Sequence, residues 1–204
     1  MSAAPVEPYG HHVRKPHSLL DAAGEISERF PGYRVEIFGG EIHVAPPADG
    51  QHGEVLTDVM LAMAALHRGE SRLIQALGMW LPTGEDDYVI PDLALVDADY
   101  TEHRLRYNCY DPAVFRLVLE VTSSNHRTDL RDKAALYAEV GVPVYVIVDR
   151  RHQRVHVLTE PKDGEYRHTV HAPGSTFTLP ESVGAEVELS VDTLLRLKPS
   201  GAVD

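Results

Sequence analysis

Two carboxylates interrupt apolar runs of the kind that form buried strands. The first run, Tyr88 to Asp97, contains Pro91-Asp92, and the second, Phe115 to Thr122, contains Glu120. Burying an ionised carboxylate is costly unless it is paired with a positive charge or bound to a metal ion. Two such positions in one chain therefore call for a partner, and they limit the folds that can accommodate both.

A third apolar run, Val144 to Val148, follows, and segments with helical periodicity separate the three runs. Apolar strands flanked by helices indicate an α/β domain with a central mixed sheet covered on both faces and antiparallel hairpins at its edge. We predict a core sheet of four or five strands, in which the strands of Asp92, Glu120 and Val144 are central.

The remaining elements follow from periodicity, turn residues and glycine positions. We predict helices over 18–30, 50–67, 130–140 and 191–197, strands over 33–38, 41–45, 72–81, 156–158, 165–171 and 176–178, and irregular structure over 99–112.

The length of 204 residues fits one domain, predicted over residues 18–197. Residues 1–17 lack the apolar core of a signal peptide and, with 198–204, are predicted to be disordered tails. The single cysteine, Cys109, cannot form an internal disulfide, and no apolar run is long enough to cross a membrane. These features predict a cytoplasmic protein without a membrane partner.

The formal charge of −12 opposes non-specific binding to DNA, which depends mainly on Lys and Arg. An acidic chain can still bind DNA weakly if its basic residues cluster or if a divalent metal neutralises its site. The local basic clusters in this sequence are more typical of solvated turns and carry little weight.

Asp92 and Glu120 form the first candidate site. On adjacent strands they could share one hard cation such as Mg²⁺, with the carbonyl of Val121 as a further ligand. The alternative is that both acids meet solvent at a sheet edge, and residue types alone favour neither interpretation.

Lys133 follows the Glu120 strand, in a helix that Thr128 or Asp129 can cap. From there it could point back at the strand ends and stabilise charge on a phosphate or orient the attacking water. The alternative is a surface ion pair with Asp129, four residues earlier. Tyr137, one turn further on, is expected to pack with its hydroxyl in water.

His52, near the start of the second helix, is a candidate acid–base or supporting residue, although capping and surface roles are commoner for a histidine there. The chain has no zinc spacing, nucleophile elbow, P-loop or dinucleotide fingerprint.

Taken together, several segments resemble the Uma family of restriction-endonuclease-like proteins, from about Tyr33 to Leu195. The resemblance rests on the order and spacing of Val35-Glu-Ile-Phe-Gly-Gly-Glu-Ile42, Gln51-His52, Val89-Ile-Pro-Asp92, Leu119-Glu120-Val-Thr-Ser-Ser124, Asp129-Leu-Arg-Asp-Lys133-Ala-Ala-Leu-Tyr137 and Gly141-Val-Pro-Val-Tyr145. That family is placed in the PD-(D/E)XK nuclease superfamily, which implies a restriction-endonuclease-like fold.

The resemblance implies roles for single residues. Pro91-Asp92 becomes the PD element and Glu120 the second acidic ligand, while Thr122 stands where the superfamily pattern has its lysine. Lys133 is then the relocated lysine, and His52, Asp129 and Tyr137 are candidate supporting residues.

The leading hypothesis is a DNA endonuclease that hydrolyses phosphodiester bonds with Mg²⁺ or Mn²⁺. A homodimer is compatible with it, because duplex cutting is often done by paired subunits, but no residue pattern indicates one. The alternative is a nuclease fold that no longer cuts and serves as a binding or regulatory module, as the net charge and Thr122 suggest. A hydrolase of another class is a weaker third option because the chain has no nucleophile motif.

Overall fold

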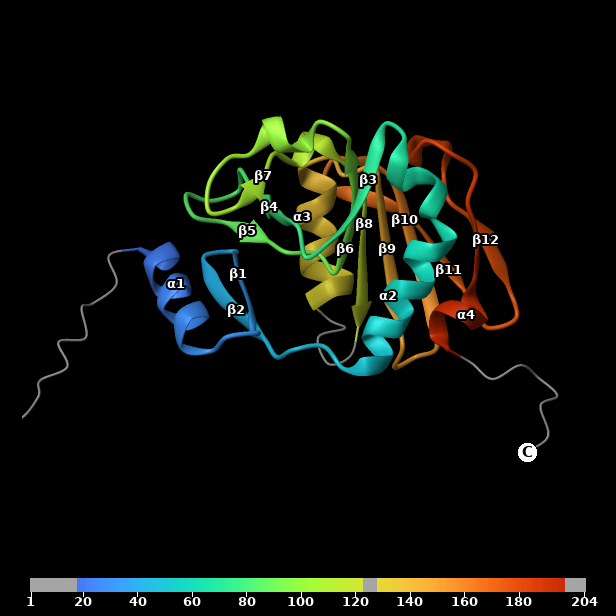
Figure 1. The fold of residues 1–204 in the computed structure, drawn as a ribbon, viewed down its shortest axis with the longest axis horizontal. Helices are drawn as coiled ribbons and strands as arrows, with labels where there is room; N and C mark the ends of the chain where they lie inside the picture. The colour runs from blue at the N-terminus through green and yellow to red at the C-terminus, as the bar shows by residue number, and fades with distance from the viewer. Residues whose placement is uncertain (1–17, 123–127, 197–204) are drawn as a thin grey trace, which may run out of the picture.

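A computed structural model describes residues 18–122 and 128–196, and the described chain forms three β-sheets with helices packed on them (Figure 1). The predicted tails, 1–17 and 198–204, lie outside the described residues. Within those residues, no helix is both long and apolar enough to span a membrane.

The largest sheet is mixed. Strands β8 and β9 run parallel, and every other neighbouring pair is antiparallel. Its order is β11 (Glu165–His171), β10 (Arg154–Lys162), β9 (Val144–Asp149), β8 (Phe115–Thr122), β6 (Leu93–Asp97) and β3 (Ser71–Gln75).

The three apolar runs therefore supply the neighbouring inner strands β6, β8 and β9, as predicted. The predicted number of strands was wrong, because the β10–β11 hairpin and β3 extend the same sheet to six strands.

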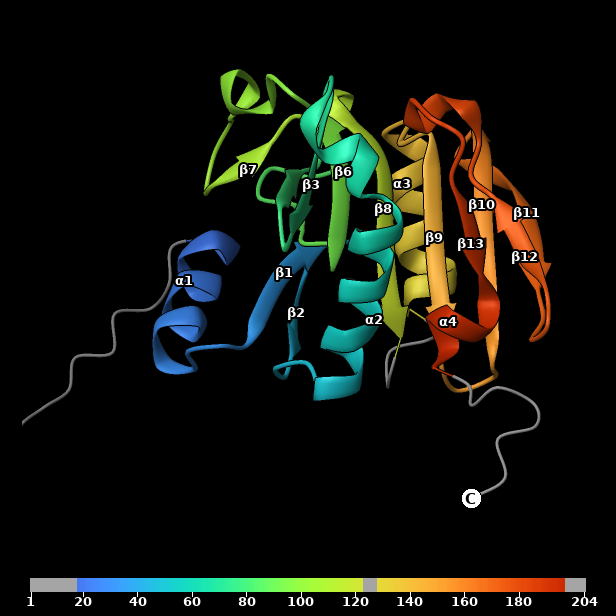
Figure 2. The same cartoon turned by 45° about the vertical axis from the view of Figure 1, so that its right-hand side comes forward.

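Both faces of this sheet are covered, which explains why β9 is buried at every position. Helix α2 (Gly50–Ala62) packs on one face, and α3 (Ala134–Glu139) packs on the other (Figures 1 and 2). Alternate residues of β8 follow this division: Leu119 packs in the core under α2, and Val118 packs in the core under α3.

A second sheet contains five strands, and α1 (Leu19–Arg29) packs against its strand β1. The Ser18 hydroxyl accepts a hydrogen bond from the Asp21 amide and so caps α1. The order of the sheet is β2 (Glu41–Ala45), β1 (Arg34–Phe38), β5 (Tyr88–Val89), β4 (Gly78–Trp80) and β7 (Cys109–Tyr110).

The predicted strands over 72–81 and 88–97 each divide in two between the sheets. Strands β3 and β6 pair in the large sheet, while β4 and β5 pair in the second sheet. The divisions coincide, since the Ala76 amide donates to the Asp92 carbonyl where both chains step from one sheet to the other. Ala76 has a left-handed backbone (φ 52°), and Pro91 has no amide hydrogen to donate to a sheet. Asp92 consequently stands at the junction of the two sheets.

Most of the other predictions hold with small changes, but residues 99–112, predicted to be irregular, contain β7, and β13 (Glu188–Ser190) was not predicted. The predicted helix over 50–67 is α2 followed by a 3₁₀ segment, Ala64–Arg68, and the helix over 130–140 begins as a π-helical segment, Thr128–Lys133. The elements not yet located are β12 (Thr176–Thr178), β13 (Glu188–Ser190), α4 (Val191–Leu195) and the 3₁₀ segments Tyr100–His103, Pro112–Val114 and Glu181–Val183.

Candidate active site

Asp92 is held by groups from three separate elements. Its Oδ2 accepts the amide of Val121 in β8 at 2.8 Å and lies 3.3 Å from His52 Nε2 in α2. Its Oδ1 accepts a hydrogen bond from Arg34 Nη1 in β1 at 2.6 Å. The residue is 8% exposed, so the alternative in which it meets solvent at a sheet edge is wrong.

These contacts keep the Asp92 carboxylate ionised. Burial alone would raise its pKa, but the hydrogen bond with His52, the charge of Arg34 and the Val121 amide act in the opposite direction and outweigh it. The pKa of Asp92 is therefore held well below its usual range.

Glu120 and Lys133 meet on the α3 side of the large sheet. Strand alternation turns Glu120 to the same face as Val118, toward the start of α3, and Lys133 is the last residue before that helix. Lys133 Nζ donates to Glu120 Oε1 at 2.7 Å, and the two residues are only 2% and 1% exposed. Lys133 is therefore not at the surface, as the alternative interpretation required, but is buried among carboxylates.

A third carboxylate, Glu36 in β1, holds Lys133 from the other side. Its Oε1 accepts from Lys133 Nζ at 2.9 Å and from the Ile90 amide at 2.6 Å, and the residue is 4% exposed. Two carboxylates thus fix one ammonium group beside Glu120.

Arg34 lies between the two predicted metal ligands. Its Nη1 is 2.6 Å from Asp92 Oδ1 and 3.6 Å from Glu120 Oε2, and it also donates to the Ile90 carbonyl at 2.9 Å. Burial would lower the pKa of this guanidinium, but the surrounding carboxylates raise it overall, so Arg34 stays charged.

Sequence reasoning missed both Arg34 and Glu36. They alternate with apolar residues in a predicted hairpin, and that pattern is typical of a strand with one face in water. The available signal was the resemblance itself, which included the segment from Val35 to Ile42 but assigned no role to its acid.

His52 is only 7% exposed and faces Asp92, so it lies where a supporting residue would be. The Asp49 side chain caps α2 by accepting the His52 amide at 2.7 Å, which fixes the start of the helix and the position of the imidazole.

Of the other two candidate supporting residues, only Tyr137 has a side chain within the described part of the structure. Tyr137 packs edge-on against Tyr145 with ring centroids 4.9 Å apart. Its hydroxyl oxygen is buried, so the expected contact with water was wrong. The side chain of Asp129 lies outside the described part of the structure.

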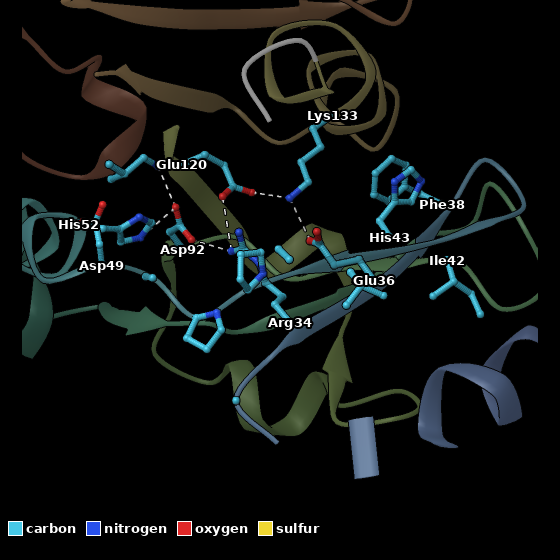
Figure 3. Close-up of a pocket in the computed structure, with 17 residues that line it drawn as sticks. Arg34, Glu36, Phe38, Ile42, His43, Asp49, His52, Asp92, Glu120 and Lys133 are labelled. Atoms are coloured by element: carbon cyan, nitrogen blue, oxygen red, sulfur yellow. Dashed lines mark hydrogen bonds and ion pairs between the residues drawn. The ribbon is translucent and has the colours of Figure 1, made fainter. Parts of the chain in front are cut away.

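The charged groups line one cavity of about 560 Å³ between the β1–β2 hairpin and the end of the large sheet (Figure 3). Arg34, Asp92, Glu120 and Lys133 form one side, and Val121 also contributes to the wall. The ring of Phe38 lies parallel to that of His43 at 3.7 Å on the same cavity. The cavity therefore joins a charged side to an aromatic one.

The donor set fits a hard divalent cation in part. One positive group can contact both Asp92 and Glu120, because Arg34 Nη1 lies 2.6 Å and 3.6 Å from their carboxylate oxygens. Carboxylates, a backbone carbonyl and water are the ligands that Mg²⁺ takes. Among the described residues, however, no three His, Cys, Asp or Glu side chains gather closely enough to hold a metal. The two acids and Val121 would need water ligands to complete the shell.

Comparison with known proteins identifies a family and a similar fold. Residues 23–192 match the family Uma2, described as "Putative restriction endonuclease". A similar solved structure is that of "a putative nuclease belonging to DUF820 from Anabaena variabilis ATCC 29413", with a TM-score of 0.62 and 16% identity, covering 79% of this chain and 89% of that chain. At that identity the similarity shows the fold, and it confirms the predicted α/β class. No curated protein matches the chain.

Proposed function

Because the chain belongs to the Uma2 family of restriction-endonuclease-like proteins, we propose that it is a Mg²⁺- or Mn²⁺-dependent endonuclease that hydrolyses phosphodiester bonds in DNA. The observation that carries the proposal is the meeting of Asp92, Glu120 and Lys133 at one cavity, from three separate segments of the chain.

In this proposal Asp92 Oδ1, Glu120 Oε2 and the Val121 carbonyl hold the metal. A bound divalent ion would lower the pKa of a water ligand and neutralise charge on the scissile phosphate. His52 and the Val121 amide both contact Asp92 Oδ2 and so direct the other oxygen toward the cavity.

Lys133 supplies the fixed positive charge of the site. Held between Glu36 and Glu120, its ammonium group needs little rearrangement to contact a phosphate oxygen or orient the attacking water. A group already in place stabilises the transition state more than one that must be ordered during the reaction.

The proposed substrate is DNA, bound weakly or with help from the metal, since the chain carries a formal charge of −12. Cutting both strands of a duplex would take two subunits, so a homodimer on DNA belongs to the same proposal. We also propose a cytoplasmic location.

A test is plasmid nicking by the purified full-length protein, with Mg²⁺ or Mn²⁺ and with EDTA. Nicking should need the metal and fall about a hundredfold or more in Asp92→Asn and Glu120→Gln, which preserve side-chain size. Asp97→Asn, which changes another acid of the same segment, is the matched control and should cut like the wild type. If Asp92→Asn cut as fast as the wild type, this site would not be the catalytic one.

A second candidate is the module that binds without cutting. One observation favours it: both proposed metal ligands already contact a cation of the protein. Arg34 contacts Asp92, and Lys133 contacts Glu120. Calorimetric titration with Mn²⁺ separates the two. An endonuclease should bind Mn²⁺ and lose that binding in Asp92→Asn, whereas a protein that neither binds Mn²⁺ nor nicks DNA would be the silent module.

A further inference from the structure

Arg34 lies where the proposed function requires the metal. Its Nη1 is the one described positive group that contacts both Asp92, at 2.6 Å, and Glu120, at 3.6 Å. Lys133 also contacts Glu120, but from the other carboxylate oxygen, Oε1, and on the side of Glu36. The two cations therefore have different positions, and only that of Arg34 coincides with the point shared by both ligands.

The charges of the cluster indicate why this position matters. Among the described side chains, three buried carboxylates, Glu36, Asp92 and Glu120, face the cations of Arg34 and Lys133, and His52 lies beside Asp92. Without Arg34, the protein lacking metal would bury two carboxylates with much of their repulsion uncompensated, which is strongly unfavourable. With Arg34 in place, a divalent cation would meet a guanidinium at close range in a partly buried site.

Arg34 is also able to leave. Its side chain is 27% exposed, compared with 3% for Lys133, and it extends from the first residue of β1 at the wall of the cavity. A guanidinium on a flexible stem can turn into water at modest cost, whereas a buried ammonium held by two carboxylates cannot.

From these observations we infer that Arg34 is a built-in competitor for the metal. It occupies the point between Asp92 and Glu120 in the metal-free protein, stabilises the fold there, and must withdraw when a divalent cation binds. The wild-type affinity for metal is thereby set below the affinity of the bare acid pair. This inference rests on the proposed metal role of Asp92 and Glu120, but it concerns binding and stability rather than cleavage.

The experiment compares Mn²⁺ binding by the wild type and by Arg34→Met, measured by calorimetry, with thermal unfolding followed in EDTA and in Mn²⁺. Methionine keeps an unbranched stem and removes the charge. In EDTA the variant should unfold at a lower temperature than the wild type. It should bind Mn²⁺ at least about tenfold more tightly, and Mn²⁺ should raise its unfolding temperature by more than it raises that of the wild type.

Two controls make the result specific. Arg150→Met removes a positive charge that contacts the cavity residue Asp49 at 3.1 Å. It should change Mn²⁺ affinity by less than about twofold if proximity to the acids decides the effect. Arg34→Met combined with Asp92→Asn should lose the gain in affinity.

Equal Mn²⁺ affinity in the wild type and Arg34→Met would overturn the inference and leave the proposed nuclease site standing. An equal gain in Arg150→Met would overturn it too, because the effect would then be one of general charge. If neither protein bound Mn²⁺, both the inference and the proposed metal site would fail.

Discussion

An Arg–Asp pair lies at each end of strand β6, and the two pairs have the same residue types but differ in burial and in the number of elements that contact them. At the far end Asp97 contacts Arg116 Nε at 2.5 Å, with the side chains 34% and 25% exposed. At the near end Asp92, with a side chain 7% exposed, contacts Arg34 at 2.6 Å and also faces His52.

The difference lies in how many elements converge. Asp97 and Arg116 belong to neighbouring strands, β6 and β8, so their pairing is local to the sheet. Asp92 lies at the junction of two sheets, where β1, α2 and β8 each supply a contact. An acid at the end of a strand is thus common, and what distinguishes a candidate site is the number of separate elements that hold the acid.

The largest expected effect is a loss of stability and of cleavage when the buried Lys133 beside the near end loses its charge, compared with the loss at the exposed Arg116. Lys133→Met should lower the free energy of unfolding by about 3–5 kcal/mol, because it leaves Glu36 and Glu120 buried without their shared cation. Cleavage should fall about a hundredfold or more. Arg116→Met, measured by the same urea titration, should cost only about 0.2–1 kcal/mol.

If Lys133→Met does not fold, the double variant with Glu36→Gln keeps the prediction testable. Removing one of the two facing carboxylates should recover part of the lost stability, so the double variant should fold and its free energy of unfolding can be measured. A loss below about 1 kcal/mol in Lys133→Met would put Lys133 in the same class as Arg116 and break the comparison.

An intermediate effect concerns pH. The pKa of Asp92 is lowered in the folded protein, while in the unfolded chain it should lie near the ordinary value of about 3.9. The folded state therefore gains stability from the ionised carboxylate above about pH 4, and this gain is lost as the pH falls through the folded pKa. In EDTA, the wild type should lose about 1–3 kcal/mol more between pH 5 and about pH 2 than Asp92→Asn does.

Asp97→Asn, measured in parallel, is the control. It shows how far the loss of any one carboxylate changes the dependence of stability on pH. If the wild type and Asp92→Asn lost stability equally on acidification, the contacts of Asp92 would not be stabilising its ionised form.

The sequence was sufficient to locate the inner strands and both acids, because a carboxylate in an apolar run is a local signal. Lys133 was a candidate from its place after the Glu120 strand, and the resemblance added its role as the relocated lysine. Nothing within its own helix distinguishes a lysine buried among carboxylates from one paired with Asp129. Its burial depends on β1, which lies far away in the sequence and contributes Glu36.

Arg34 and Glu36 could not be predicted for a related reason. Their alternation with apolar residues is the same whether that face of the hairpin meets water or another part of the protein. Likewise, residues 71–97 divide between the two sheets where the Ala76 amide donates to the Asp92 carbonyl. Neither the sequence around Ala76 nor that around Asp92 predicts this hydrogen bond. These features arise from contacts between distant segments, which periodicity does not report.

The smallest expected effect tests the two Arg–Asp pairs directly, by double-mutant cycles in EDTA at low and high salt. The coupling between Arg116 and Asp97 should be about 0.5 kcal/mol and should largely vanish in about 1 M NaCl, since salt screens exposed charges. The coupling between Arg34 and Asp92 should be larger and should mostly persist, because Asp92 is buried and screened much less. Each cycle uses Arg→Met and Asp→Asn, so general effects of salt on stability cancel within it. If both couplings fell by the same fraction in salt, the near-end pair would be a surface pair like the other, and Arg34 could not hold the metal position as inferred.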